Sequence, residues 1–252
     1  MLSDTQGSSK DKHERKTRRG PVLTLAAVLL AGIVIARRAA APLRMPFAEP
    51  WQRSLAVKRG AAEASRLIAD AETRYRELYV GRPRPASRAL RIHLERSMLP
   101  GLALYQALLA AGDDRETALD TMDALCAESV TGLVTLMALL SRLPKPFAIF
   151  RRVEPWVVRL GFPEEGWELE QLENSEDCVA YNVNRCFYLD TLTTYGAPEL
   201  TRVFCDGDDV YFPALEPSIT WERTTTLGRG GDCCDFRWSR AASGLQPGAR
   251  GA

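Results

Sequence analysis

Histidine is scarce in this sequence, in which only His13 and His93 occur among 252 residues. His13 lies in a basic segment, and His93 lies in the helical stretch RALRIHLERS, where we expect a partly exposed structural histidine. A catalytic pair of cysteine and histidine is therefore not expected. Without an imidazole, a reactive cysteine would need an aspartate, an arginine or a metal ion to lower its pKa from about 8.5.

Two other common signatures are missing. No pair of C-x-x-C units marks a structural zinc site, and the glycine-rich stretch at 228–231 is not followed by the Lys-Ser/Thr and helix of a phosphate-binding loop. A chain of this length does not need a disulfide framework, so we expect its six cysteines to be free thiols. They are Cys126, Cys178, Cys186, Cys205, Cys233 and Cys234.

Charge is unevenly distributed, although the formal net charge is only +1. Residues 51–110 carry eleven Lys and Arg against five Asp and Glu, whereas residues 161–210 carry twelve Asp and Glu against two Arg. The acidic region would repel a phosphate backbone, so nucleic acid is not an expected partner. The acidic run DGDD at 206–209 lacks the glutamate and the length of an EF-hand loop, which leaves a solvated turn or a weak cation site.

The N-terminal region contains the apolar run PVLTLAAVLLAGIVIA at 21–36, sixteen residues without a charge. A helix over this run would be about 24 Å long, slightly less than the roughly 30 Å core of a bilayer. The run predicts a single N-terminal membrane anchor that follows a basic, disordered tail at 1–20, and the membrane side is left open. A cleaved signal peptide and a buried helix are the alternatives.

One domain is expected over residues 51–240, after a linker with several prolines at 37–50 and before a disordered tail at 241–252. Apolar residues recur at helical spacing over 51–160, and residues 165–240 contain short runs that alternate or are rich in β-branched and aromatic residues. The fold class is therefore α+β, with an N-terminal helical half packed with a four-stranded antiparallel sheet that is interrupted by helices. The four strands are expected within 166–174, 178–186, 218–228 and 232–239.

Helix boundaries in the first half follow from proline, glycine and capping residues. Asp113 and Glu116 resemble a capping box, in which Asp113 accepts hydrogen bonds from the first-turn amides while Glu116 reaches back. Further helices are expected at 51–80, at 87–111 with a kink at Pro100, and at 130–140, an apolar stretch that is too short to span a bilayer and should be buried.

Alternation along two strands determines which faces the cysteines occupy. In the strand at 178–186, Asn182, Asn184 and Cys186 are expected to share one face. Such a stripe is unusual for a hydrophobic core and is compatible with a pocket lining. In the strand at 232–239, the two adjacent cysteines face opposite ways. Cys234 is expected beside Phe236 and Trp238, and Cys233 beside Asp235 and Arg237.

Four short motifs follow one another in the C-terminal half. They are an Asn-x-x-Arg-Cys segment that ends at Cys186, a Gly-x-Pro-Glu-Leu turn at 196–200, the stretch CDGDD at 205–209, and the closing TTTLGRGGDCCDF at 224–236. Each motif is weak alone, but in this order and spacing they resemble the L-2-amino-thiazoline-4-carboxylic acid hydrolase family. The resemblance covers roughly residues 55–240.

The resemblance implies hydrolytic opening of a 2-amino-thiazoline ring that carries a carboxylate, by attack on its amidine-like carbon and departure of the ring sulfur. This chemistry needs a nucleophile or activated water, a proton donor, and a group that holds the carboxylate. Carried over by position, the nucleophile or ligand candidates are Cys186, Cys205 and Cys234, the acid or base candidates are Asp209 and Asp235, and the substrate-orienting candidates are Asn182, Arg185 and Thr226. A divalent metal is left open.

We therefore expect a membrane-tethered hydrolase that acts on a small cyclic amidine or thiazoline carboxylate. The alternative is a non-catalytic sensory domain that holds a small carboxylate ligand or a cysteine-bound metal on the same scaffold. Cysteine is often fully buried in proteins, so core packing is the competing interpretation for every thiol, above all for Cys126 and Cys178. The chain also has Cys233 where the family often has a histidine. The oligomeric state is left open.

Overall fold

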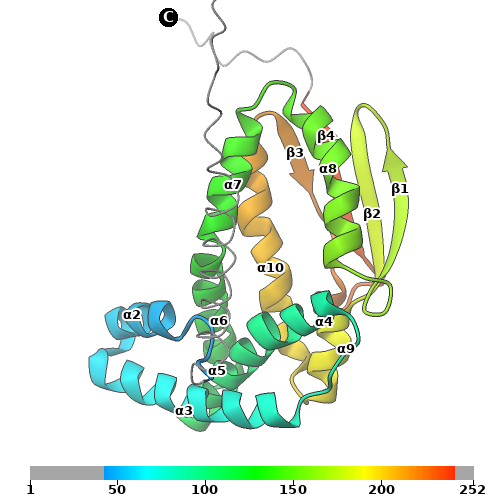
Figure 1. Ribbon diagram of the computed structural model, residues 1–252. Helices are drawn as coiled ribbons and strands as arrows, with labels where there is room; N and C mark the ends of the chain where they lie inside the picture. The colour runs from blue at the N-terminus through cyan, green and yellow to red at the C-terminus, as the bar shows by residue number, and fades with distance from the viewer. Residues whose placement is uncertain (1–42, 242–252) are drawn as a thin grey trace, which may run out of the picture. The chain divides into compact units, whose positions relative to one another are not determined.

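The computed structural model describes residues 43–241 (Figure 1). The expected basic tail at 1–20 and the candidate anchor at 21–36 lie outside the described residues, as does the C-terminal tail from residue 242. Among the described residues, 44–241 belong to one compact unit. Its first helix already begins at Ala48 and Met45 is buried, so the end of the expected linker belongs to the folded unit.

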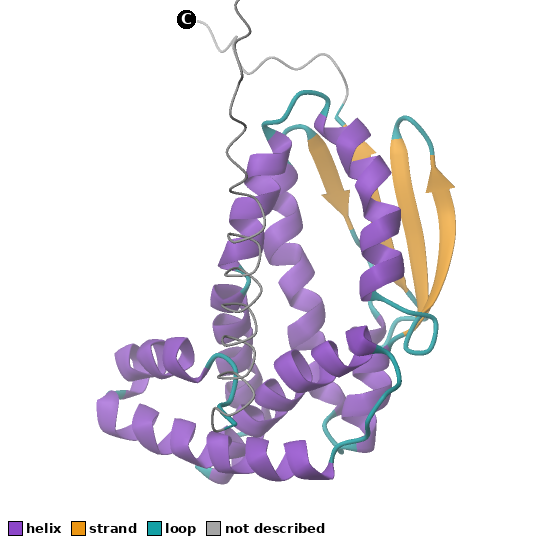
Figure 2. Cartoon of the chain, viewed as in Figure 1, coloured by secondary structure: helices purple, strands orange, loops and turns teal. Residues whose placement is uncertain are grey.

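The first half of this unit is entirely helical, as the sequence predicts (Figure 2). Its elements are α2 (Ala48–Arg59), α3 (Ala61–Gly81), α4 (Arg88–His93), the π-helical turn η1 (Leu94–Met98), α5 (Leu99–Ala110), α6 (Arg115–Ser129), α7 (Thr131–Ser141) and α8 (Pro146–Gly161). Helix α5 is apolar on all sides and is almost completely buried in the helical core, to which α2, α3, η1 and α6 also contribute.

The second half mixes strands and short helices. Its elements are β1 (Glu168–Asn174), β2 (Cys178–Arg185), α9 (Phe187–Thr194), η2 (Pro198–Leu200), α10 (Thr201–Tyr211), η3 (Phe212–Leu215), β3 (Ile219–Glu222), η4 (Leu227–Arg229) and β4 (Cys234–Arg240). The strands form one antiparallel sheet in the order β1-β2-β4-β3. The α+β class, the hairpin and the four antiparallel strands are therefore confirmed.

One face of the sheet is covered by helices and the other is polar. Phe147 and Phe150 of α8 pack on Val179 of β2 and Trp238 of β4, and Figure 1 shows α8 lying across these strands. On the opposite face, Asn182 pairs in register with Asp235. The alternation within β4 is as predicted, because Cys234 and Trp238 are buried on the helix side while Arg237 is exposed.

The expected Asn-Asn-Cys stripe does not form. Strand β2 ends at Arg185, and Cys186 lies in the turn that leads into α9. Because Cys186 no longer follows the strand alternation, its side chain joins the apolar cluster that contains Val183 and Cys234, whereas Asn184 is exposed.

Three helix expectations are also corrected. The single helix expected at 51–80 is broken at Gly60, whose φ of 85° lies outside the helical region. The irregularity expected at Pro100 falls one turn earlier, in η1, because a proline without an N–H fits best in the first turn of α5. The helix at 130–140, expected to be buried, has no buried residue in α7.

The capping residue of α6 is Asp114 rather than Asp113. Asp114 Oδ1 accepts a hydrogen bond from the Thr117 N–H at 2.7 Å. Asp113 instead pairs with Arg59, with N–O distances of 2.6 and 2.9 Å, and so joins the end of α2 to the loop before α6. Two neighbouring aspartates were available, and the tertiary ion pair selects which one caps.

Among the described residues, no single helix has both the length and the apolar composition that a membrane crossing requires. The bent pair of α6 and α7, which meet at 46°, satisfies this requirement only when the two helices are taken together.

Candidate active site

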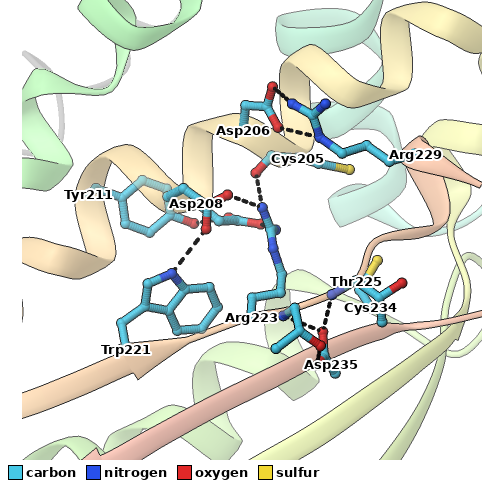
Figure 3. A network of polar contacts seen from close by, with 12 residues as sticks. Cys205, Asp206, Asp208, Tyr211, Trp221, Arg223, Thr225, Arg229, Cys234 and Asp235 are labelled. Atoms are coloured by element: carbon cyan, nitrogen blue, oxygen red, sulfur yellow. Dashed lines mark hydrogen bonds and ion pairs between the residues drawn. The ribbon is translucent and has the colours of Figure 1, made fainter. Parts of the chain in front are cut away.

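A buried arginine organises the region between α10 and β3 (Figure 3). The Arg223 side chain is only 2% exposed and lies between two carboxylates, at 2.9 Å from Asp208 and 2.5 Å from Asp209. It also donates a hydrogen bond to the backbone oxygen of Cys205 at 3.0 Å. The residue that follows β3 is thereby joined to the middle of α10.

The pKa values of Arg223 and Asp208 depend on each other. Burial on its own lowers the pKa of Arg223, but Asp208 and Asp209 raise it above the usual value, so the guanidinium stays charged. Burial raises the pKa of Asp208 to about 6, against the opposing effects of the hydrogen bond from Tyr211 and the charge of Arg223. Asp209 is half exposed and accepts a hydrogen bond from Trp221 Nε1 at 3.0 Å.

Asp235 fixes the loop that follows Arg223. Its Oδ1 accepts the backbone N–H groups of Thr224 and Thr225 at 2.9 and 2.7 Å, and its Oδ2 accepts the Thr224 hydroxyl at 2.6 Å. Burial acts to raise the pKa of Asp235, but these three hydrogen bonds outweigh it and lower the pKa below its usual value. The ionised carboxylate therefore holds the loop at Thr224 and Thr225 in place through these hydrogen bonds.

Three thiols lie together on the helix-covered side of the sheet. Cys205 comes from α10, Cys234 from the first position of β4, and Cys186 from the turn before α9. The Cys205 thiol is within hydrogen-bonding reach of Cys234 Sγ, and the Leu227 N–H donates to the same sulfur at 3.2 Å. Cys186 packs against Cys234 and interacts electrostatically with Cys205.

The surroundings of the three thiols shift their pKa values in different directions. The hydrogen bond from Cys205 lowers the pKa of Cys234, with a further contribution from the Leu227 N–H, although burial opposes both. The same contact, together with burial, raises the pKa of Cys205 well above the usual thiol value. Burial also raises the pKa of Cys186. Cys234 is thus the more acidic thiol of the pair, and Cys205 is the less acidic one.

The turn η4 brings backbone close to the thiols. A Cβ atom on Gly228 would lie 2.9 Å from Cys205 Sγ, closer than real Cβ atoms come, and 3.2 Å from the Arg202 backbone nitrogen, which is also tight. Gly230, two residues later, has a φ of 84°, which favours glycine. This glycine-rich turn therefore lets the backbone reach the thiols and then reverse toward β4.

Thr226 leaves a polar atom without a partner beside this turn. Its side chain is 5% exposed, and no described residue makes a hydrogen bond with its Oγ1. Buried hydroxyls are normally paired in native proteins, so an unpaired one beside a cavity is a candidate ligand contact.

Two adjoining cavities open along this edge of the sheet, with volumes of about 590 and 460 Å³. Both are large enough for a small cyclic carboxylate. Asp209, Arg223 and Thr224 line both cavities. The larger cavity extends over Asn182 and Asp235, and the smaller one extends over Thr225, Thr226, Arg229, Gly230 and Gly231.

Comparison with known proteins gives a family assignment. The family model described as L-2-amino-thiazoline-4-carboxylic acid hydrolase matches residues 91–238. This chain belongs to that family. No curated protein and no solved structure matches it. The matched region contains the thiols, the Arg223 group and both cavity linings, and it confirms the family expected from the four motifs.

The residues expected from the hydrolase family fall into three groups. Those that line a cavity are Asn182, Asp209, Asp235 and Thr226. Cys186, Cys205 and Cys234 lie together next to η4, but they line neither cavity. Arg185 lies apart, because it binds the backbone oxygens of Glu164 and Glu165 and pairs with Asp190 at 3.7 Å.

Another family motif residue has a packing role. Glu199, in the Gly-x-Pro-Glu-Leu turn, accepts a hydrogen bond from the Tyr105 hydroxyl at 2.8 Å and so fixes η2 to the central helix α5. His93 is similarly structural, since its two ring nitrogens contact the Tyr188 hydroxyl and the Gly161 backbone oxygen, both at 2.9 Å. Neither residue belongs to the cavities.

The sequence interpretation missed Arg223 and the Leu227 N–H. An arginine is usually exposed, so Arg223 gave no signal by itself, and the acidic run DGDD was interpreted only as a solvated turn or a weak cation site. Within residues 43–241, no group of three or more His, Cys, Asp and Glu side chains is arranged to hold a metal ion. The role of each candidate residue stays a prediction.

Proposed function

We propose that this member of the family is a hydrolase that opens the ring of a small cyclic amidine carboxylate of the 2-amino-thiazoline-4-carboxylate type. Water supplies the oxygen that bonds to the amidine carbon. The bond between that carbon and the ring sulfur breaks, and the released sulfur takes up a proton. The product is a cysteine whose nitrogen carries a carbamoyl group.

The observation that carries the proposal is the position of Cys205 and Cys234 against the turn that lines the smaller cavity, and the pKa values of these two thiols are shifted in opposite directions. Two titratable groups whose pKa values are pushed apart can divide the roles of nucleophile and acid. The Cys234 thiolate adds to the amidine carbon and displaces the ring sulfur, which receives the proton of Cys205. Water then attacks the same carbon, one of its protons moves to the amidine nitrogen and the other returns to Cys205. The bond to Cys234 Sγ breaks, which restores the thiolate, and the carbamoyl product leaves.

The lining of the smaller cavity supports binding of such a substrate, because the turn at 226–231 that lines it also contacts Cys205 and Cys234. The unpaired Thr226 hydroxyl is available for a ring nitrogen or a carboxylate oxygen. Arg229 lines the smaller cavity and is 55% exposed, so its guanidinium can bind the substrate carboxylate in addition to its contact with Asp206 at 2.5 Å. Arg223 is saturated by Asp208 and Asp209, so its contribution is the positive charge that it places near the thiols.

Membrane tethering through residues 21–36 is a further part of the proposal. It is supported by the sixteen-residue uncharged run and the basic residues that flank it.

The test is turnover of the thiazoline carboxylate by the full-length protein, followed by chromatography of the carbamoyl product. We expect Cys234→Ala to abolish product formation and Cys205→Ala to lower it. The matched control is Cys126→Ala, since Cys126 is also a free thiol but packs against the helical core and lines neither cavity. Unchanged turnover in Cys234→Ala, or ligand binding without any turnover in the natural protein, would contradict the proposal.

A further inference from the structure

Exposed apolar side chains are concentrated on α7 and α8. Fifteen large apolar side chains are exposed among the described residues, and eight of them lie within the 28 residues from 133 to 160. Clusters of exposed large apolar side chains on a soluble protein often mark an interaction surface. The eight are Leu133, Leu136, Leu139, Leu143, Val153, Trp156, Val157 and Leu160, and we call them the α7–α8 face.

Basic residues predominate in the segment that carries this face, and the exposed Glu164 and Glu165 follow the segment directly. Residues 130–163 contain five basic residues and a single acidic one, Glu154. Glu154 is only 7% exposed and accepts a hydrogen bond from the Tyr181 hydroxyl at 2.8 Å, so it faces the sheet and not the solvent. The solvent side is therefore apolar with a positive rim. The basic residues are Arg142, Lys145, Arg151, Arg152 and Arg159.

Helix α8 carries exposed apolar side chains and exposed basic side chains next to each other. Phe147 and Phe150 face the core, whereas Trp156 is 67% exposed on the opposite side of the helix. Arg152 precedes Trp156 by four residues and Arg159 follows it by three, so both exposed guanidinium groups flank the indole on the helix surface. A helix with exposed tryptophan and leucine beside arginines has the composition of an interfacial membrane helix.

We propose that the α7–α8 face lies on the surface of a lipid bilayer that contains anionic headgroups. The apolar side chains enter the boundary between headgroups and acyl chains, and the five basic residues contact the phosphates. Charge complementarity favours this occupant over a second copy of the chain. A symmetric contact through this face would bring two identical basic rims together. The contact is separate from the candidate anchor at 21–36 and concerns the folded unit itself.

The fluorescence of Trp156 can test membrane contact at this face specifically, because the candidate anchor at 21–36 contains no tryptophan. Trp51, Trp167 and Trp238 are 3 to 4% exposed, and Trp221 is half-buried against Asp209. We expect vesicles of phosphatidylglycerol and phosphatidylcholine with brominated acyl chains to quench part of the tryptophan fluorescence of the full-length protein. This part is lost in Trp156→Phe, and it is much smaller in vesicles of phosphatidylcholine alone.

Charge variants test the electrostatic part. The double substitution Arg152→Gln with Arg159→Gln should reduce the ratio of docked to undocked protein roughly fivefold for each arginine. Leu136→Glu with Leu160→Glu should remove the quenching. Val57→Glu with Val80→Glu is the matched control, because these valines are 88% and 81% exposed on α2 and α3, away from the face.

Two results would overturn the proposal. One is equal quenching of the natural protein and Trp156→Phe in anionic vesicles. The other is a dimer that Leu136→Glu with Leu160→Glu dissociates, measured by sedimentation in the absence of lipid, since this would assign the face to a second copy of the chain. Neither result bears on turnover of the thiazoline, so failure of this proposal is distinguishable from failure of the proposed function.

Discussion

Replacing Cys205 with alanine removes the hydrogen bond that contributes most to the lowered pKa of Cys234. A hydrogen bond to a charged acceptor contributes about 1.5 to 3 kcal/mol, and a thiol is a weak donor, so we expect the lower end of this range. At a pH below the pKa, a loss of about 1.5 kcal/mol reduces the thiolate population roughly tenfold. The Leu227 N–H and the charge of Arg223 remain in this variant.

The assay is thiolate absorbance near 240 nm in a pH titration, taken as the part that disappears in Cys234→Ser. Alkylation of Cys234, followed by mass spectrometry, gives a second readout with a different expected size. A more basic thiolate is also more nucleophilic, so a tenfold smaller population should slow alkylation only about threefold. Cys205→Ser keeps a hydroxyl donor and should retain the thiolate. The same titration curve for Cys205→Ala and the natural protein would refute the pairing of the two sulfurs.

Three further predictions concern the surroundings of the site. Burial raises the pKa of Glu154 to about 7, so its contribution to stability is complete below pH 4.5 and is lost as the pH rises through 7. In urea unfolding, the natural protein should lose up to about 3 kcal/mol of stability relative to Glu154→Gln between pH 4.5 and 8. A difference between the two proteins that stays constant with pH would contradict this. Gly228→Ala should reduce turnover more than stability, since the added Cβ displaces Cys205 Sγ, and unchanged kinetics would argue against the close approach. Arg223→Met should destabilise the fold by about 3 to 5 kcal/mol, because Asp208 and Asp209 then lack their shared cation. In the same unfolding assay, Asp209→Asn should lower the free energy of unfolding much less.

Local patterns were sufficient for much of the fold. The hairpin of β1 and β2 follows from alternation on both sides of a polar turn, and α5 falls within the helical stretch that was expected at 87–111. The capping residue was misplaced by one position, because Asp113 and Asp114 have the same intrinsic preference for the cap. Only the ion pair with Arg59, 54 residues away, decides between them.

Burial was harder to predict than secondary structure. The apolar composition of α7 is equally compatible with a protein core and with an exposed face, since hydrophobicity does not specify what covers it. Cys186 was assigned to the wrong face because the strand alternation stops one residue before it. The group around Arg223 depends on α10 docking beside β3, a tertiary contact without a local signature.

The order Cys234-Asp235 in β4 has a physical explanation. Adjacent strand residues face opposite sides of the sheet, so Asp235 accepts the amides of Thr224 and Thr225 on one side while Cys234 accepts the Leu227 N–H on the other. One end of a strand therefore holds both ends of a four-residue loop. Thr226 lies between these two attachments, and its hydroxyl is kept buried without a partner. Such a loop is already ordered before a ligand arrives, so binding would require little further loss of conformational entropy.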